Sequence, residues 1–150
     1  MKIKKYIKKV KYFNFKAFTL VEILVVSTII AFLAGGGFLS YSQINIQSRN
    51  AKRKSDLEQI RTALEIYRSN NNQYFPGSGT FSGNCQSINW LNLYLPSIPN
   101  DPRSPSFYYR CNISRSDYTL GAYLENGGVG NCGQCGNALC NYCVGPYGQR

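Results

Sequence analysis

The chain has 150 residues and a formal net charge of +10, with 17 lysines and arginines, seven acidic residues, six cysteines and no histidine. A chain of this length accommodates about one domain. The missing histidine excludes Ser-His and Cys-His catalytic pairs, so we expect no catalytic residues, and we expect no cofactor. Seven of the basic residues lie in residues 1–17, which contain no acid. The charge therefore belongs to a terminal segment, not to a folded surface that binds nucleic acid.

The basic segment runs into an apolar stretch, residues 18–39, in which Glu22 is the only ionisable side chain. As a helix this stretch spans about 33 Å, which is enough to cross the hydrocarbon core of a membrane. A buried core helix is the other interpretation, but the remaining chain is too small to surround it. A conventional signal-peptide cut among Ala34, Gly35 and Gly36 and an uncleaved anchor are further alternatives.

Charges on either side of the stretch predict its orientation. Seven lysines precede it, whereas four basic residues follow it within about 15 residues: Arg49, Lys52, Arg53 and Lys54. The larger cluster should stay in the cytoplasm, so the C-terminal part should lie outside it. The cysteines agree with this placement, because disulfides persist in oxidising compartments.

The junction of the two segments reads KAFTLVEILVV, residues 16–26. This stretch, following a lysine-rich leader, resembles the N-terminal motif of type IV prepilins and type II secretion pseudopilins. The resemblance implies that a prepilin peptidase cuts between Ala17 and Phe18 and that Phe18 is then N-methylated. It makes Glu22 the fifth residue of the mature chain. Ala17 stands where the family usually has glycine, which departs from the pattern by one small residue.

Glu22 needs an explanation, because a charge at the centre of a bilayer costs about 2.5–3.5 kcal/mol on insertion scales. Cleavage turns the amide nitrogen of Phe18 into an α-amino group with a reference pKa of about 8, largely cationic at neutral pH. Phe18 and Glu22 are four residues apart and share a helical face. The resemblance implies that Glu22 pairs with the amine of a neighbouring subunit. That pair would set the axial register, since an unpaired charge in a dry filament core is costly.

One long helix is expected from Phe18 to about Asn70, where three consecutive asparagines form a stop. A narrow apolar stripe in its second half predicts packing onto a small sheet. The stripe consists of Leu57, Ile60, Leu64 and Tyr67. Opposite charges four residues apart predict ion pairs. These are Lys52–Asp56, Lys54–Glu58 and Arg61–Glu65. The glycines at 35–37 favour either close helix packing or local unwinding in a filament.

The remaining residues predict a small head with many turns. Turn signals occur at Pro76-Gly77, Ser82-Gly83-Asn84 and Pro99-Asn100-Asp101-Pro102. Residues 107–111 and 118–124 have the composition of strands joined by a polar loop. The segments YLPSIPNDP and YTLGAYLE resemble the heads of small pilin-like proteins and of the major pseudopilin. We therefore expect an α+β fold: a long N-terminal helix, membrane-spanning in its first half, packed on a small antiparallel β-sheet head as in type IV pilins.

The six cysteines predict disulfides and no metal site. Cys85 and Cys111 stand apart, and the other four form a C-x2-C-x4-C-x2-C pattern. These four are Cys132, Cys135, Cys140 and Cys143. Zinc sites usually separate two such pairs by about 15–20 residues, and iron–sulfur spacing also differs. We expect Cys85 to bond Cys111 and the other four to pair among themselves. A zinc site and a redox-active C-x-x-C remain as alternatives.

Two weaker candidate sites involve charged residues. Calcium could use oxygen donors in the C-terminal part, which are Asp117, Glu125 and Asn126. DNA could contact the basic cluster of Arg49, Lys52, Arg53 and Lys54, although lipid headgroups or neighbouring acids suit that cluster better. Nucleic acid is therefore not expected as a partner.

Four segments and one main function follow. They are a basic prepilin leader at 1–17, a transmembrane and filament-core half-helix at 18–39, an amphipathic half-helix at 40–72, and a small disulfide-stapled β-rich head at 73–150. We expect a structural subunit of a type IV pilus-like filament, held single-pass in the inner membrane and then moved into a surface filament. Its expected partners are the prepilin peptidase, other copies of itself, minor pilins and the inner-membrane assembly platform. The alternatives are a type II secretion pseudopilin and a membrane-anchored extracytoplasmic thiol or zinc protein.

Overall fold

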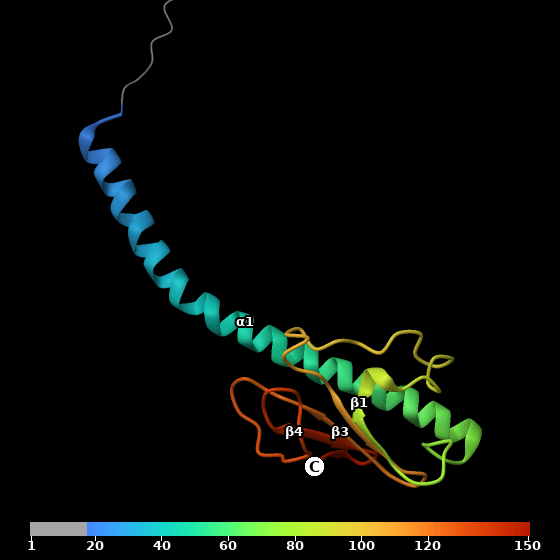
Figure 1. Ribbon diagram of the computed structural model, residues 1–150. Coiled ribbons are helices and arrows are strands. Elements are labelled where there is room, and N and C mark those ends of the chain that lie inside the picture. Colours follow the sequence, from blue (N-terminus) through green and yellow to red (C-terminus); the bar gives the residue numbers. More distant parts are fainter. Residues whose placement is uncertain (1–17) are drawn as a thin grey trace, which may run out of the picture. The chain divides into compact units, whose positions relative to one another are not determined.

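The computed structural model describes residues 18–150, and in residues 37–40 it describes only the backbone (Figure 1). One helix, α1, runs from Leu20 to Asn71. It is followed by strand β1 (Phe81–Asn84) and the short 3-10 helix η1 (Cys85–Ser87). Four further strands follow: β2 (Arg110–Ile113), β3 (Tyr118–Ala122), β4 (Tyr142–Gly145) and β5 (Gly148–Gln149). The chain divides into two compact units that meet at residues 40 and 41, and α1 contributes to both.

Helix α1 ends at two asparagines, Asn71 and Asn72, close to the position that the sequence predicts. Asn72 has a φ of 58°, in the left-handed region that asparagine tolerates better than most residues. Its backbone N–H donates to the Arg68 carbonyl at 2.7 Å, and the side chain of Asn71 donates to the Tyr67 carbonyl at 2.9 Å. These bonds satisfy carbonyls that the helix end would otherwise leave free.

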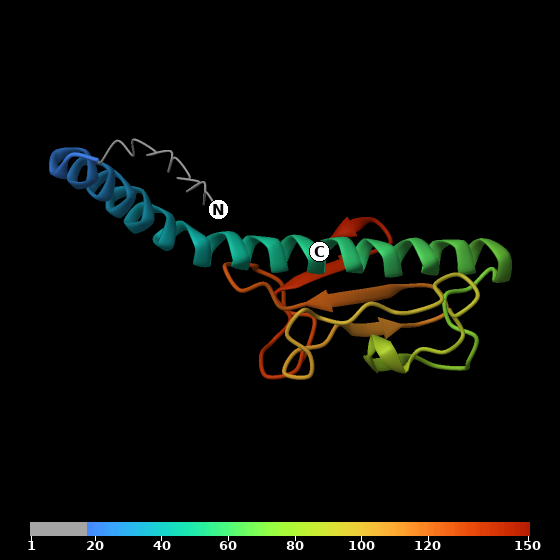
Figure 2. The ribbon, with the colours of Figure 1, turned by 90° about the horizontal axis from the view of Figure 1, so that it is seen from above.

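The head is a five-stranded antiparallel sheet in the order β1-β2-β3-β4-β5. Residues 41–71 of α1 lie across one face of this sheet (Figure 2). The α+β fold expected from the sequence is thereby confirmed. Two local predictions were wrong. Ser82–Asn84, read as a turn, pairs with β2, and the strand expected from Phe107 begins at Arg110, because Phe107 instead bridges to Gly136 in the cysteine-rich loop.

The apolar stripe of α1 forms the centre of the core, as predicted. Its four residues are buried and pack with inward-facing side chains of β2, β3 and β4. These partners are Cys111, Ile113, Tyr118, Leu120 and Val144. Successive strand residues point to opposite faces, so only alternate residues of each strand reach the helix.

The three ion pairs expected along α1 do not form, because the charged groups find other partners. Asp56 is buried and accepts a hydrogen bond from the Tyr109 hydroxyl at 2.6 Å. Glu65 accepts from the Tyr118 hydroxyl at 2.7 Å, and Arg61 pairs with Glu58 at 3.1 Å. The helix face toward the sheet is therefore joined to it by tyrosine–carboxylate bonds in addition to apolar contacts.

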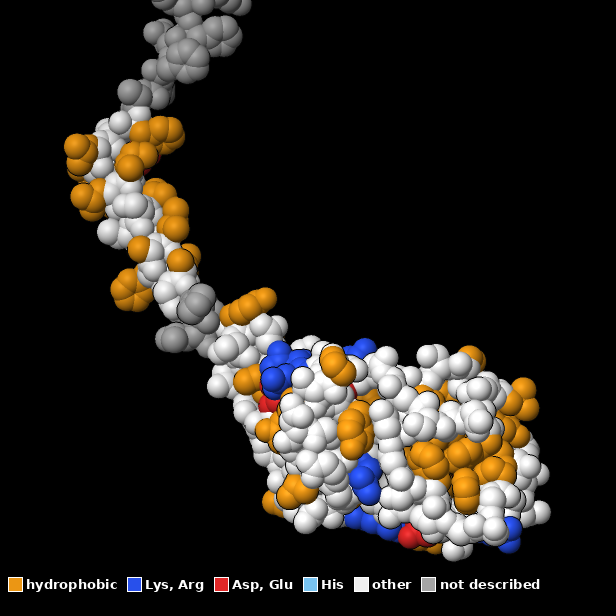
Figure 3. All heavy atoms as spheres, in the orientation of Figure 1, with side chains coloured by type: hydrophobic (Ala, Val, Ile, Leu, Met, Phe, Trp, Pro, Cys, Tyr) orange, Lys and Arg blue, Asp and Glu red, His pale blue; other side chains and the backbone are white. Residues whose placement is uncertain are grey.

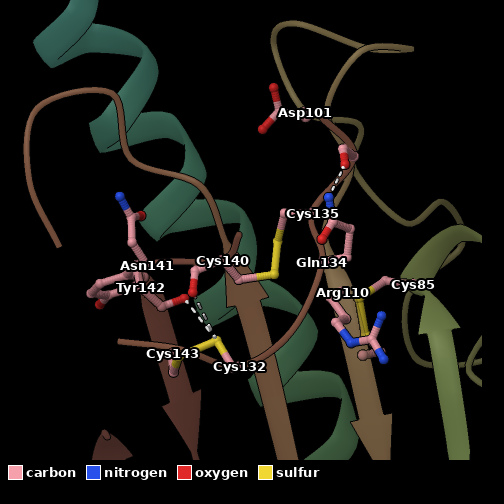
Figure 4. Close-up of a disulfide and its surroundings, with 12 residues drawn as sticks. Cys85, Asp101, Arg110, Cys132, Gln134, Cys135, Cys140, Asn141, Tyr142 and Cys143 are labelled. Atoms are coloured by element: carbon pink, nitrogen blue, oxygen red, sulfur yellow. Dashed lines mark hydrogen bonds between the residues drawn. A yellow bond between two sulfur atoms is a disulfide. The ribbon is translucent and has the colours of Figure 1, made fainter. Parts of the chain in front are cut away.

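Three disulfides staple the head (Figure 4). Cys85 bonds Cys111, which ties the end of β1 to β2. The other four cysteines pair across their two C-x2-C motifs: Cys132 bonds Cys143, and Cys135 bonds Cys140. The second bridge is nested within the first, and together they fold residues 132–143 into a compact loop.

Peptide mapping of the non-reduced protein is expected to return these three bridges. Replacing Cys85 and Cys111 together by serine should lower the free energy of unfolding by about 3 kcal/mol, because the bridge closes a loop over a separation of 26 residues. Denaturant unfolding of the mature chain in detergent, read by tryptophan fluorescence, measures this loss. Six free thiols with bound zinc, or bridges within each C-x2-C motif, would contradict the assignment.

Candidate functional site

The N-terminal start of α1 is the candidate functional site, and Thr19 positions it. The backbone N–H of Glu22 donates to Thr19 Oγ1 at 3.2 Å, and the N–H of Ile23 donates to the Thr19 carbonyl at 3.2 Å. Thr19 is therefore the helix N-cap, and the helix begins two residues after the expected cut. This role of Thr19 was not predicted from the sequence. The Thr-x-x-Glu spacing of a capping box was the signal that could have found it.

Glu22 lies in the first turn of the helix, where its side chain is exposed. Negative charge is favoured there by the positive end of the helix dipole and by the free N–H groups of the first turn. Within residues 18–150, no side-chain donor is recorded for its carboxylate. Phe18 is also exposed, at 73%. Ala17, the residue before the expected cut, lies outside the described residues, so the cleavage site and the pairing of Glu22 stay predictions.

The described part of this half of α1 exposes large apolar side chains along its length, and Figure 3 shows those on one face. By length and composition it can cross a membrane. Its two hydroxyl side chains are satisfied locally, because Ser27 Oγ donates to the Leu24 carbonyl at 2.9 Å and Thr28 Oγ1 to the Val25 carbonyl at 2.8 Å. Such bonds suit a lipid environment, in which no water replaces a missing partner. Glu22 is thus the one charged side chain of this apolar surface.

Gly35 and Gly36 lie inside α1, which continues through them without a break. A Cβ built on either residue meets no atom within 4 Å. Both expectations for these glycines, close packing against another helix and local unwinding, require neighbours or a filament and stay predictions.

The basic cluster in the second half of α1 is largely used inside the head. Arg53 is completely buried and donates two hydrogen bonds to the Asp101 carboxylate, at 2.7 and 3.0 Å. It donates two further bonds, to Glu125 at 2.9 Å and to Asn50 Oδ1 at 3.1 Å. Arg49 also binds Glu125 through two bonds, at 2.7 and 2.6 Å. Two of the four residues considered for DNA contact therefore bind acids of the same chain. We call Arg49, Arg53, Asp101 and Glu125 the arginine–carboxylate cluster, in which Arg53 is buried and Arg49 is partly exposed.

Hydrogen bonds from Arg49 and, more weakly, from Arg53 lower the pKa of Glu125 to about 2, although burial opposes this shift. A lowered pKa stabilises the fold above the ordinary range of the carboxyl, and the contribution is lost as pH falls toward about 2. Glu125 had been considered as a calcium ligand. Its two carboxylate oxygens are instead occupied by guanidinium groups, so it has no free oxygen to offer a cation.

Comparison with known proteins decides the family. The motif described as the prokaryotic N-terminal methylation motif matches residues 13–38. The chain is 31% identical over 134 residues to type II secretion system core protein G of Pseudomonas aeruginosa, covering 80% of this chain and 92% of that protein. The chain belongs to the type IV pilin and type II secretion pseudopilin family. No solved structure matches it.

Membership in the pilin and pseudopilin family links the N-terminal site to processing and assembly. Proteins of this family are structural subunits that a prepilin peptidase processes and that assemble with other pilins in a secretion or pilus system. The apolar half of α1 fits the membrane anchor of such a subunit. The exposed acid in its first turn is the feature that distinguishes this pilin helix from an ordinary anchor.

We expect the mature chain to begin at Phe18. N-terminal sequencing or intact mass of protein from the native membrane measures this directly, and the mass also reports a methyl group on Phe18. Replacing Ala17 by a large residue such as leucine should block processing and leave the intact precursor. A mature chain beginning at Gly37, or an unprocessed leader in the wild type, would contradict the assignment.

Proposed function

We propose that this chain is a structural subunit of a type IV pilus-like filament. In this proposal residues 1–17 are a cytoplasmic leader, residues 18–39 hold the subunit single-pass in the inner membrane, and the head lies outside the cytoplasm. The observation that carries the proposal is an acid in the first turn of a helix whose first half is otherwise apolar and which begins two residues beyond the expected prepilin cut.

The proposed mechanism uses the charge that processing creates. The prepilin peptidase removes the leader and frees the amine of Phe18, and N-methylation leaves that amine basic. As a subunit leaves the bilayer, its amine meets Glu22 of a neighbouring copy, and the helices pack into the filament core. Because a buried charge without a partner is costly, only the stagger that pairs amine and carboxylate is favoured. The partners are other copies, minor pilins and the inner-membrane assembly platform.

A second candidate is a pseudopilin of type II secretion, which would form a short filament that drives export. It is favoured by the likeness to core protein G of the Pseudomonas aeruginosa system, which extends over the head as well as the N-terminal motif. Both candidates use the same anchor, the same processing and the same Glu22 chemistry. They differ in the filament's length and in what it moves.

Deletion of the gene in its own host separates the two candidates. A pilus subunit should remove or shorten surface filaments that are recovered by shearing, with the secreted proteins unchanged. A secretion pseudopilin should leave those filaments in place and trap normally secreted proteins inside the outer envelope. Complementation with the wild-type chain is the control. A deletion that changes neither filaments nor secretion would overturn both.

A further inference from the structure

The face of the sheet turned away from α1 carries a polar groove. On β2, Cys111 and Ile113 point into the core, so the alternate residues Arg110 and Asn112 point to the opposite face. The groove has a volume of about 720 Å³. It is lined by Arg110, Asn112, Thr119, Asn131, Arg150 and the Cys132–Cys143 disulfide, among other residues. Its lining contains two arginines and no acid.

Arg110 differs from the arginines of the arginine–carboxylate cluster in having no acidic partner within residues 18–150. Its one recorded side-chain bond runs from Nη2 to Ser82 Oγ, at 2.9 Å. Arg150 donates to Thr119 Oγ1 at 3.1 Å and to the Asp117 carboxylate at 2.8 Å, and that ion pair is partly exposed. Donors on Arg110 thus remain available in a groove whose other polar groups are amides and hydroxyls.

Two glycines leave room for the arginine side chains. Gly133 has a φ of 100°, and a Cβ there would lie 2.5 Å from Arg110 Nε. A Cβ on Gly145 would likewise lie 2.5 Å from Arg150 Nε. Gly133 follows Cys132, which the disulfide anchors to Cys143 on β4, and Arg110 lies next to this loop (Figure 4). The backbone on one side of the groove is therefore constrained by the Cys132–Cys143 bridge, and the glycines make room for the guanidinium groups.

We propose that this groove binds a small organic oxyanion, one that carries a carboxylate or phosphate together with hydroxyl groups. A guanidinium group offers paired N–H donors that match a carboxylate or a phosphate. The amides of Asn112 and Asn131 suit the hydroxyls of such a ligand. The volume lies within the range of small-molecule sites, about 300–1,000 Å³. Sugar acids and sugar phosphates combine these features. The proposal does not depend on which system the filament serves.

Isothermal titration calorimetry on the mature full-length chain in non-ionic detergent tests the site. The probes are D-glucuronate, D-glucose 6-phosphate and, as the uncharged comparison, D-glucose. At least one anion should bind, glucose should not, and the pair of anions distinguishes a carboxylate site from a phosphate site. Arg110→Gln should weaken binding by about tenfold or more, since bonds to charged groups are the strong ones. Arg110→Lys keeps the positive charge but loses the paired N–H donors of the guanidinium group. Its affinity should lie between those of the wild type and Arg110→Gln.

Arg115→Gln is the matched control. Arg115 is an exposed arginine whose Nε donates to the Gly77 carbonyl, and it does not line the groove. Its removal should leave the affinity unchanged, and circular dichroism should show all variants folded. Two results overturn the proposal: the absence of binding by either anion at millimolar concentration, and an equal loss of affinity in the Arg110 and Arg115 variants.

Discussion

Glu22→Gln is expected to leave the subunit processed and inserted in the membrane but to prevent most of its assembly. Removal of the charge lowers the cost of insertion, so the amount held in the membrane should not fall. The new amine of Phe18 then lacks its carboxylate inside a dry helical bundle. Breaking a buried pair costs about 3–5 kcal/mol. At about 1.4 kcal/mol for each factor of ten, assembly should weaken at least about a hundredfold.

The measurement compares sheared surface filaments with subunit retained in the membrane, and N-terminal sequencing confirms that the leader is removed. Glu58→Gln is the matched control, because Glu58 lies on the same helix with its side chain half exposed and, among residues 18–150, its carboxylate pairs only with Arg61. It should assemble like the wild type. Glu22 must have another role if processed Glu22→Gln subunits assemble as well as the wild type.

Replacing Arg53 by methionine is expected to destabilise the head strongly. The substitution keeps an unbranched apolar stem but removes the guanidinium group. It leaves Asp101, which is almost wholly buried, without its two hydrogen bonds from Arg53, and Glu125 with one donor fewer. Loss of one partner from a buried pair costs about 3–5 kcal/mol. Denaturant unfolding of the mature chain in detergent measures the loss.

Lys52→Met is the control for Arg53, because Lys52 is its exposed neighbour on the same helix. A surface substitution of this kind should change the free energy of unfolding by less than about 0.5 kcal/mol. A second variant, Arg53→Met with Asp101→Leu, removes both charges, and it should recover part of the loss because no orphaned carboxylate remains at position 101. Equal stability of Arg53→Met and the wild type would show that the pair is dispensable.

The helix and its buried face could be read from the sequence because their signals are local. The spacing of Leu57, Ile60 and Leu64 depends only on helical geometry, and the prepilin motif is contiguous. The partners of Arg53 could not be read in this way. Asp101 is 48 residues away along the chain and Glu125 is 72 residues away, and only the sheet brings them together.

Most strands of the sheet also could not be predicted from local sequence patterns. Strands β1, β4 and β5 have two to four residues each and contain glycine, asparagine or cysteine in place of a clear alternation of apolar and polar residues. Ser82-Gly83-Asn84 has the composition of a turn, and its pairing with β2 together with the neighbouring Cys85–Cys111 bridge overrides that preference. Short strands of this kind are specified by their neighbours.

The nested disulfides bear on the order in which the head matures. As the chain emerges from its N-terminal side, Cys132 and Cys135 become available together, and the nearest possible bond is the one between them. The native bridges instead require Cys140 for the inner link and Cys143 for the outer one. Early oxidation therefore favours a wrong bond that must be reshuffled, a process of seconds to hours without help. In the proposed placement of the head outside the cytoplasm, its maturation requires thiol exchange in that compartment, and an isomerase there would set the rate at which correctly bridged subunits accumulate.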